Sequence, residues 1–329
     1  MTSPTEAESA AAAPLRLGIS ACLLGHEVRW DGGHKRDNFL IGTVGKFVEW
    51  VPVCPEVEVG MSTPRETLRL VTGPGGEDDV RMVTTKGGED HTAAMKRWAT
   101  KRVRDLADED LDGYVLKRDS PSCGMERVKL YDGKGGVRKK GSGLFAAELM
   151  GRNPLLPCEE EGRLNDPLLR ENFLERVFAF RRLRAAFASR WTVGDLVRFH
   201  TAEKLQLMAH DVQTYRELGR LVAGAKDAPR AELAATYQQL YMAAMKKLAT
   251  VRKHTNVLQH MQGWFSEKLS DEERAELTQL ITDYRAGLVP LIVPVTLIRH
   301  YVRRLDVSYL RGQTYLEPAP KELMLRNHA

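Results

Sequence analysis

The sequence predicts an α/β domain with a mainly parallel sheet, followed by an all-α C-terminal domain. A chain of 329 residues is longer than one hydrophobic core usually organises. In the N-terminal half, short apolar runs alternate with helical segments, which is typical of parallel strands joined by crossover helices. From Pro167 to about Arg304 nearly every segment has helical period. We therefore place the domain boundary near residue 163.

Local patterns locate the elements of the first domain, residues 15–163. Buried strands are expected at 15–19, 50–53 and 113–116, with a further strand at 154–156, and helices at 92–107 and 144–150. The Gly-rich segments 73–79 and 132–136 are typical of surface turns. Residues 1–14 contain two glutamates, an alanine run and no Lys or Arg, which predicts a disordered tail.

The second domain, residues 164–329, carries recognisable helix ends. Pro167 is expected in the first turn of one helix, and another should end near His210. Asp211 is expected to cap the helix that follows. Ser270 with Glu273 three residues later predicts a capping box at the start of a further helix.

The composition is that of an ordinary soluble protein, with 43% apolar and 28% charged residues. The formal net charge of +5 would suit an anionic ligand or RNA, although a solvated surface explains it equally well. The first fourteen residues lead us to expect no secretory signal, and the most apolar stretch, 288–298, is too short to span a bilayer. We expect a cytoplasmic protein. Because thiols stay reduced in that compartment, its four cysteines are better candidates for metal binding or catalysis than for disulfides.

Cys22, Cys54 and Cys123 each lie just after the carboxyl end of an expected strand. In open α/β sheets that edge forms the ligand crevice, so the three can meet despite separations of 32 and 69 residues. Each lies in a turn rich in Gly, Pro or Ser, where backbone amides can approach the sulfides of a cluster. Three thiolates leave one iron of a four-iron cluster open to substrate. We therefore expect an iron–sulfur cluster.

The cysteines could also serve other roles. A lone cysteine at a strand end most often packs as a small hydrophobe. A closed zinc site would need a fourth ligand, such as His26, His34 or Cys158. Cys158 precedes an acidic stretch that we interpret as a connector at the domain end, and we expect Cys158 itself to be structural.

Three segments resemble, in order, the signature segments of the thiouracil desulfidase family: 20–25 around Cys22, 53–65 around Cys54, and 120–124 around Cys123. The resemblance covers roughly residues 15–160. It implies that the three cysteines ligate a 4Fe–4S cluster whose fourth iron binds the sulfur of a thiolated substrate. Residues 168–326 resemble the YbgA-like helical domain, which implies a fold and little chemistry.

As a hypothesis, the reaction is hydrolytic desulfuration of a thiolated nucleobase such as 2-thiouracil, with release of hydrogen sulfide and no net redox change. A soft iron centre favours sulfur over oxygen. Glu56, two residues after Cys54, could activate water or serve only as a hydrogen-bond acceptor. Ser120 and Ser122 could bind the base or move a proton, although serines here often only complete a turn. For Arg65 we favour pairing with a carboxylate.

Two other functions stay open. One is sulfur transfer or desulfuration on thiolated tRNA, and the other is a non-catalytic iron–sulfur module that senses oxygen or iron. The basic segments 181–184 and 246–254 could contact RNA, although solvated helix faces are the commoner explanation. Comparing activity on free 2-thiouracil with activity on thiolated tRNA would separate the nucleobase reaction from the tRNA reaction. The sequence specifies no oligomeric state.

Overall fold

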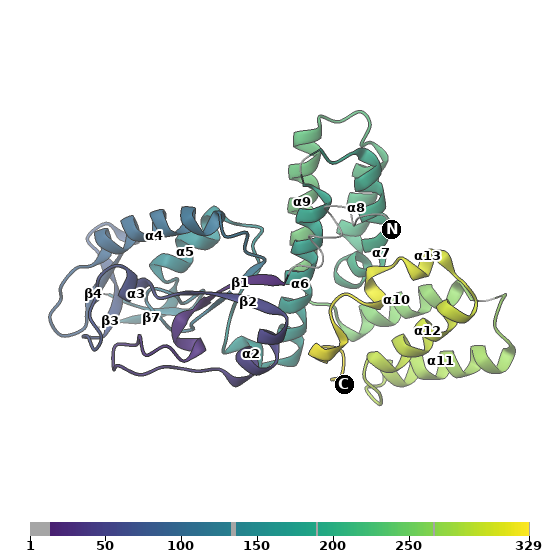
Figure 1. Cartoon of the computed structure of the whole chain (residues 1–329), viewed down its shortest axis with the longest axis horizontal. Helices are drawn as coiled ribbons and strands as arrows, with labels where there is room; N and C mark the ends of the chain where they lie inside the picture. The colour runs from purple at the N-terminus through teal and green to yellow at the C-terminus, as the bar shows by residue number, and fades with distance from the viewer. Residues whose placement is uncertain (1–13, 133–135, 189, 266, 329) are drawn as a thin grey trace, which may run out of the picture. The chain divides into compact units, whose positions relative to one another are not determined.

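The computed structural model describes residues 14–132, 136–188, 190–265 and 267–328 (Figure 1). The expected tail lies outside these residues, apart from Pro14. The chain divides into two compact units, an α/β unit of Ala13–Asn165 and a helical unit of Asp166–Ala329. Within the described residues, no helix combines the length and apolar character that crossing a membrane requires.

The α/β unit is built on a parallel sheet with strand order β2-β1-β5-β8. Ser20 pairs with Val53, and Ile19 pairs with Val115, so the carboxyl ends of three strands lie along one edge. The chain places β2 on one side of β1 and β5 on the other, and sheets of this kind bind ligands where the order reverses. The strands are β1 (Leu15–Ser20), β2 (Val48–Val53), β5 (Gly113–Leu116) and β8 (Cys158–Glu160).

The first three of these strands confirm the prediction, but the strand expected at 154–156 is wrong. That segment is a turn, in which the backbone N–H of Leu156 donates to the carbonyl of Asn153 (3.0 Å). Pro154 and Pro157 flank it, and prolines lack the N–H that a strand ladder needs.

The fourth strand begins at Cys158, so the prediction of an acidic connector after this residue is also wrong. Glu159 and Glu160 are both buried, which their partners make possible. Glu160 Oε1 accepts a hydrogen bond from the backbone N–H of Met125 (2.8 Å), and Glu159 Oε1 accepts one from Arg163 Nε (2.7 Å). Arg163 lies only four residues after Glu159, whereas Met125 lies 35 residues before Glu160.

A second sheet, with strand order β4-β3-β6-β7, was not predicted. Its central pair, β3 and β6, is parallel, and an antiparallel hairpin completes each side. The turn expected at 73–79 is in fact the tip of the β3–β4 hairpin, and residues 133–135 of the turn expected at 132–136 lie outside the described residues. The strands are β3 (Leu68–Gly73), β4 (Gly76–Thr84), β6 (Val128–Tyr131) and β7 (Val137–Gly141).

Two longer helices pack on the parallel sheet. Ala99 of α4 and Phe145 of α5 lie in the same buried cluster as Tyr114 of β5. A Cβ at Gly18 would lie 2.2 Å from the Tyr114 ring, so only glycine fits beneath it. The helices of this unit are η1 (Ala21–Leu24), α2 (Asn38–Gly42), η2 (Val44–Lys46), α3 (Pro55–Glu58), α4 (Thr92–Ala107), α5 (Leu144–Arg152) and η3 (Arg163–Asn165).

The helical unit confirms the predicted helix starts. Pro167 is the first residue of α6, and Ser270 and Glu273 form both halves of the capping box of α11. Asp211 occupies the predicted N-cap position of α8, where its carboxylate accepts a hydrogen bond from the Thr214 hydroxyl (2.5 Å). The helices are α6 (Pro167–Ala186), α7 (Val193–His210), α8 (Val212–Ala223), α9 (Arg230–Met245), α10 (Val251–Gly263), α11 (Asp271–Arg285), α12 (Ile292–Arg304), α13 (Ser308–Arg311), η4 (Thr314–Leu316) and η5 (Lys321–Leu323).

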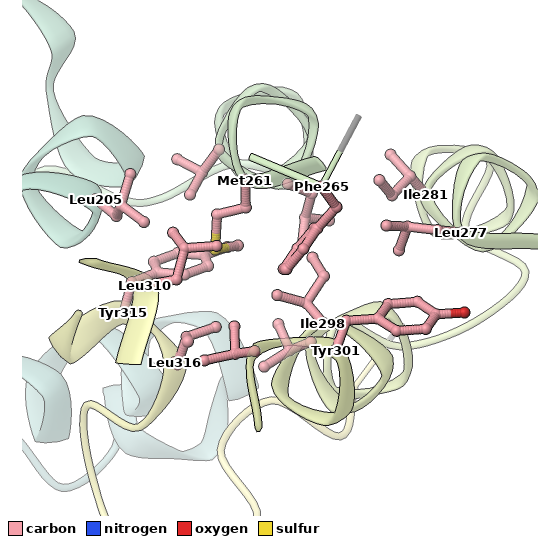
Figure 2. Close-up of a cluster of buried hydrophobic side chains, with 14 of the residues drawn as sticks. Leu205, Met261, Phe265, Leu277, Ile281, Ile298, Tyr301, Leu310, Tyr315 and Leu316 are labelled. Carbon is pink, nitrogen blue, oxygen red and sulfur yellow. The ribbon is translucent and has the colours of Figure 1, made fainter. Parts of the chain in front are cut away.

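A hydrophobic core of this unit lies where α10, α11, α12 and the C-terminal segment meet (Figure 2). Met261 and Phe265 point into it from the α10 side, opposite Ile298 of α12. All three side chains are fully buried. The helical unit is therefore held by a hydrophobic core of its own.

Candidate functional site

A cavity of about 400 Å³ is lined by residues that follow the carboxyl ends of β1, β2 and β5. The volume lies within the range usual for small-molecule sites, about 300–1,000 Å³. The predicted site residues all line it: Cys22, Cys54, Cys123, Glu56, Ser120 and Ser122. Arg65, Lys117 and Asp119 line it as well.

The first two cysteines are fixed by the turns in which they lie. Cys22 is part of η1, and its carbonyl accepts a hydrogen bond from the backbone N–H of Lys35 (2.9 Å). Cys54 immediately precedes α3, and its N–H donates to Glu58 Oε1 (3.1 Å). The Cys54 thiol lies 3.8 Å from the carbonyl oxygen of Val28. The Cys22 carbonyl also accepts the N–H of Gly25 (3.3 Å) and the Cys54 carbonyl that of Glu58 (2.9 Å), so the backbone of each cysteine makes two hydrogen bonds.

The third cysteine lies on a loop that rests on the start of α5. The N–H of Leu144 donates to the carbonyl of Pro121 (3.0 Å), and the N–H of Phe145 donates to that of Ser122 (3.0 Å). A Cβ at Gly143 would lie 2.5 Å from the carbonyl atoms of Ser122. The loop that carries Cys123 can approach the helix this closely only because residue 143 is glycine.

A chain of hydrogen bonds runs along the cavity wall from Arg65 to Ser120. Arg65 Nε donates to Glu56 Oε2 (3.0 Å), and the Ser122 hydroxyl donates to Glu56 Oε1 (2.7 Å). The hydroxyls of Ser122 and Ser120 are 3.0 Å apart, and Ser120 Oγ accepts the backbone N–H of Cys123 (3.1 Å). With Ser122 donating to Glu56, Ser120 is the donor to Ser122. The chain therefore points its protons toward the carboxylate.

The cysteine side chains are neutral thiols in these surroundings. Burial raises the pKa of Cys22 to about 11, although the nearby Lys117 ammonium opposes this rise. Burial also raises the pKa of Cys54 and of Cys123. A metal bound here would replace these protons, because the thiolate is the metal ligand. Three sulfur donors on one cavity are the ligand type that iron–sulfur clusters use, so these residues fit such a group.

A site for a single metal ion is a different case. Among the residues that the structure describes, no three His, Cys, Asp or Glu side chains lie close enough together to hold one ion. In a cluster, the cysteine thiolates bind different irons and need not meet at one point. The suggested fourth zinc ligands His26, His34 and Cys158 do not line the cavity, and Cys158 is buried in the core with Leu149.

Three further lining residues come from a turn that was not singled out in the sequence: Arg29, Trp30 and Lys35. Their segment contains Gly32 and Gly33, which indicate a turn, but no local signal says that this turn faces the cysteines. Arg29 pairs with Asp31 at 3.3 Å. This turn is placed beside the cavity by its hydrogen bond with Arg65, and that contact can be known only from the fold.

Most charges around the cavity are balanced locally. Lys117 Nζ lies 2.5 Å from Glu161 Oε1, and Arg118 Nε lies 3.1 Å from Asp119 Oδ2. Arg65 pairs with Glu56, as was favoured from the sequence. The cations that line the cavity are thus largely paired with carboxylates.

The basic segments of the helical unit are partly used inside that unit. Arg182 Nε donates to the buried Glu203 (2.7 Å), and Lys253 Nζ donates to the carbonyls of His210 (2.6 Å) and Leu248 (2.9 Å). His254 is buried against the Tyr315 hydroxyl (2.8 Å). RNA contact by the segments 181–184 and 246–254 stays a prediction.

Residues 17–161 match the family described as 2-thiouracil desulfurase, and residues 204–320 match a protein family of unknown function, DUF1722. The chain is 34% identical over 158 residues to the uncharacterized protein YbgA of Escherichia coli (strain K12). This match covers 48% of this chain and 94% of YbgA. The chain is 33% identical over 153 residues to the uncharacterized protein YbbK of Bacillus subtilis (strain 168), a match that covers 46% of this chain and 98% of YbbK. A solved structure, the 4Fe–4S-dependent thiouracil desulfidase TudS, shares 31% identity at a TM-score of 0.36 and spans 46% of this chain and 93% of that one. The two family matches fall on the two units of the chain.

Proposed function

The chain belongs to the 2-thiouracil desulfurase family over residues 17–161 and to the DUF1722 family over residues 204–320, and on this basis we propose that its α/β unit removes sulfur from a thiolated nucleobase such as 2-thiouracil. The observation that carries the proposal is one cavity lined by three cysteines and by the hydrogen-bonded side chains of Ser120, Ser122 and Glu56.

Cys22, Cys54 and Cys123 would hold the cofactor. When bound by these thiolates, a 4Fe–4S cluster supplies an open iron that binds a thiocarbonyl sulfur and polarises the carbon attached to it. Water supplies one oxygen and two hydrogens, and the sulfur leaves as hydrogen sulfide. The reaction therefore needs no external oxidant or reductant.

The serine–glutamate chain would move the proton of the attacking water. Ser120 accepts this proton and passes its own through Ser122 to Glu56 Oε1. The backbone N–H of Cys123 stabilises negative charge that develops on Ser120 Oγ. Arg65 holds the other carboxylate oxygen, so Glu56 keeps its orientation while it takes up the proton. One proton would return along this path from Glu56 to the departing sulfur, and the added hydroxyl would give up the second, so that the products are the carbonyl and hydrogen sulfide.

The first test is iron and acid-labile sulfide content after anaerobic purification, for the wild type and for each Cys→Ala variant. We expect about four irons per chain, lost with Cys22→Ala, Cys54→Ala or Cys123→Ala and kept with Cys158→Ala, the matched control. The wild type should convert 2-thiouracil to uracil and hydrogen sulfide, and Glu56→Gln should keep its iron and lose turnover. Zinc in place of iron, or iron that also needs Cys158, would contradict the proposal.

The same assay decides between the functions that the sequence left open. Turnover of thiolated tRNA without turnover of free 2-thiouracil would indicate the RNA substrate. A cluster without turnover of either, in the wild type and in Glu56→Gln alike, would indicate a sensing or binding module.

A further inference from the structure

We propose that Trp30 is the stacking surface for the nucleobase ring, and that it makes the site selective for aromatic thiolated rings over open-chain thioamides. This inference rests on the proposed function and adds a specificity residue to it. Trp30 lines the same cavity as the three cysteines, and 45% of it is exposed. It is the one aromatic residue among those that line the cavity in the described part of the chain.

Exposure alone would not carry the inference, because single apolar residues are common on protein surfaces. The second observation is that, among the described residues, no aromatic ring or cation packs on the indole of Trp30. Trp98, Trp191 and Trp264 each pack against another aromatic ring, with centroids 5.5, 5.0 and 4.5 Å apart. Within the described residues, Trp30 makes no such ring contact and no cation–π contact. An exposed indole on a cavity wall, with no other ring stacked on it, is available to a flat ligand.

The third observation is that the turn that carries Trp30 is rigidly attached to the cavity wall. The Trp30 carbonyl accepts a hydrogen bond from the backbone N–H of Arg65 (2.9 Å), and the nearby carbonyl of Val28 accepts one from Arg65 Nη2 (3.0 Å). The turn closes on itself through the N–H of Gly32, which donates to the carbonyl of Arg29 (3.0 Å). Arg65 thus fixes both the carboxylate of Glu56 and the turn of Trp30, so a stacked base would be held in register with the proton path.

The chemistry fits a planar ring that carries sulfur. Every nucleobase has a π face, and a base stacked on an aromatic side chain is bound whatever its substituents. The cysteines would select the sulfur, whereas Trp30 would select the ring. An open-chain thioamide offers sulfur without a ring and would gain nothing from the indole.

The test compares Trp30→Leu, which keeps an apolar side chain without a π face, with Trp30→Phe, which keeps a smaller one. Trp264→Leu is the matched control, since Trp264 is also 45% exposed but belongs to the helical unit. We expect Trp30→Leu to weaken uracil binding, measured by equilibrium dialysis, between about 5-fold and 100-fold. The KM for 2-thiouracil should rise by the same factor at nearly constant kcat, and Trp30→Phe should recover most of the affinity. Iron content and turnover of thioacetamide should not change.

Unchanged uracil affinity in Trp30→Leu would overturn the proposal, as would absence of uracil binding in the wild type. An equal loss of thioacetamide turnover would also overturn it, because the turn would then serve only to shape the site. If the wild type binds uracil but fails to desulfurate 2-thiouracil, the proposed function fails while uracil binding still decides the role of Trp30.

Discussion

The pairing of Arg65 with Glu56 allows a quantitative test of the site. Replacing Arg65 by Met keeps a long apolar side chain but removes every N–H of the guanidinium. Glu56, whose side chain is 16% exposed, would lose its cationic partner and keep only the hydrogen bond from the Ser122 hydroxyl. Loss of one partner of a buried ion pair costs about 3–5 kcal/mol. We therefore expect Arg65→Met to lower the free energy of unfolding by about 3 kcal/mol, measured by urea denaturation of the full chain.

Part of this loss comes from other contacts of Arg65, such as the one to the Val28 carbonyl. A double-mutant cycle with Glu56→Gln isolates the ion pair, because no unpaired carboxylate is left in that background. There Arg65→Met should cost at least about 1 kcal/mol less than in the wild type. The control is Arg198→Met, which removes an exposed ion pair with Asp195 and should cost about 0–1 kcal/mol. Equal losses in the two Glu56 backgrounds, or a loss no larger than the control's, would refute the reasoning.

Three further outcomes follow from particular contacts. Gly143→Ala, at the N-cap of α5, should lower the free energy of unfolding by about 1–3 kcal/mol and reduce iron content, because its Cβ would meet the Ser122 carbonyl. The control Gly151→Ala, within α5, has open space around its Cβ and should do neither. Tyr114→Phe should raise stability by about 1 kcal/mol in thermal unfolding, because the buried hydroxyl has no hydrogen-bond partner among the described residues; a clear loss would show that it has one. Burial lowers the pKa of His200 from the ordinary 6.5 to about 4. As the pH falls, the unfolded chain therefore binds a proton at this histidine before the folded chain does, and the free energy of unfolding decreases between pH 6.5 and pH 4. Denaturation at pH 7 and pH 5 should show about 1–2 kcal/mol less loss in His200→Gln than in the wild type, and identical losses would contradict this.

Elements with local signals could be predicted from the sequence. The helix Thr92–Ala107 has the predicted bounds, and the capping box at Ser270 forms as expected, because both depend on residues a few positions apart. The second sheet could not be predicted in this way. Its strand β7 is mostly exposed and basic, and β3 pairs with β6 some sixty residues later, so the pairing is set by the whole fold.

The buried glutamates of β8 illustrate the same limit. A Cys-Glu-Glu run looks polar and therefore solvent-facing, since Glu is rarely buried without a partner. Glu160 can be buried because it accepts a hydrogen bond from the Met125 N–H, and no local sequence pattern near either residue predicts that contact. Pattern reading fails where long-range hydrogen bonds outweigh local polarity.

The candidate site was easier to anticipate than the second sheet, because strand ends in a parallel sheet meet whatever the intervening chain does. That rule placed the cysteines together but said nothing of Trp30, whose turn is held by Arg65. It also accounts for the place of the hydrogen-bonded chain for which we propose proton transfer. Glu56 follows Cys54 by two residues, and Ser122 directly precedes Cys123, so the turns that orient the cysteine sulfurs also orient the proposed acid–base groups. A substitution that moves either turn should therefore impair cluster binding and proton transfer together, and only changes beyond the backbone of these turns can separate the two.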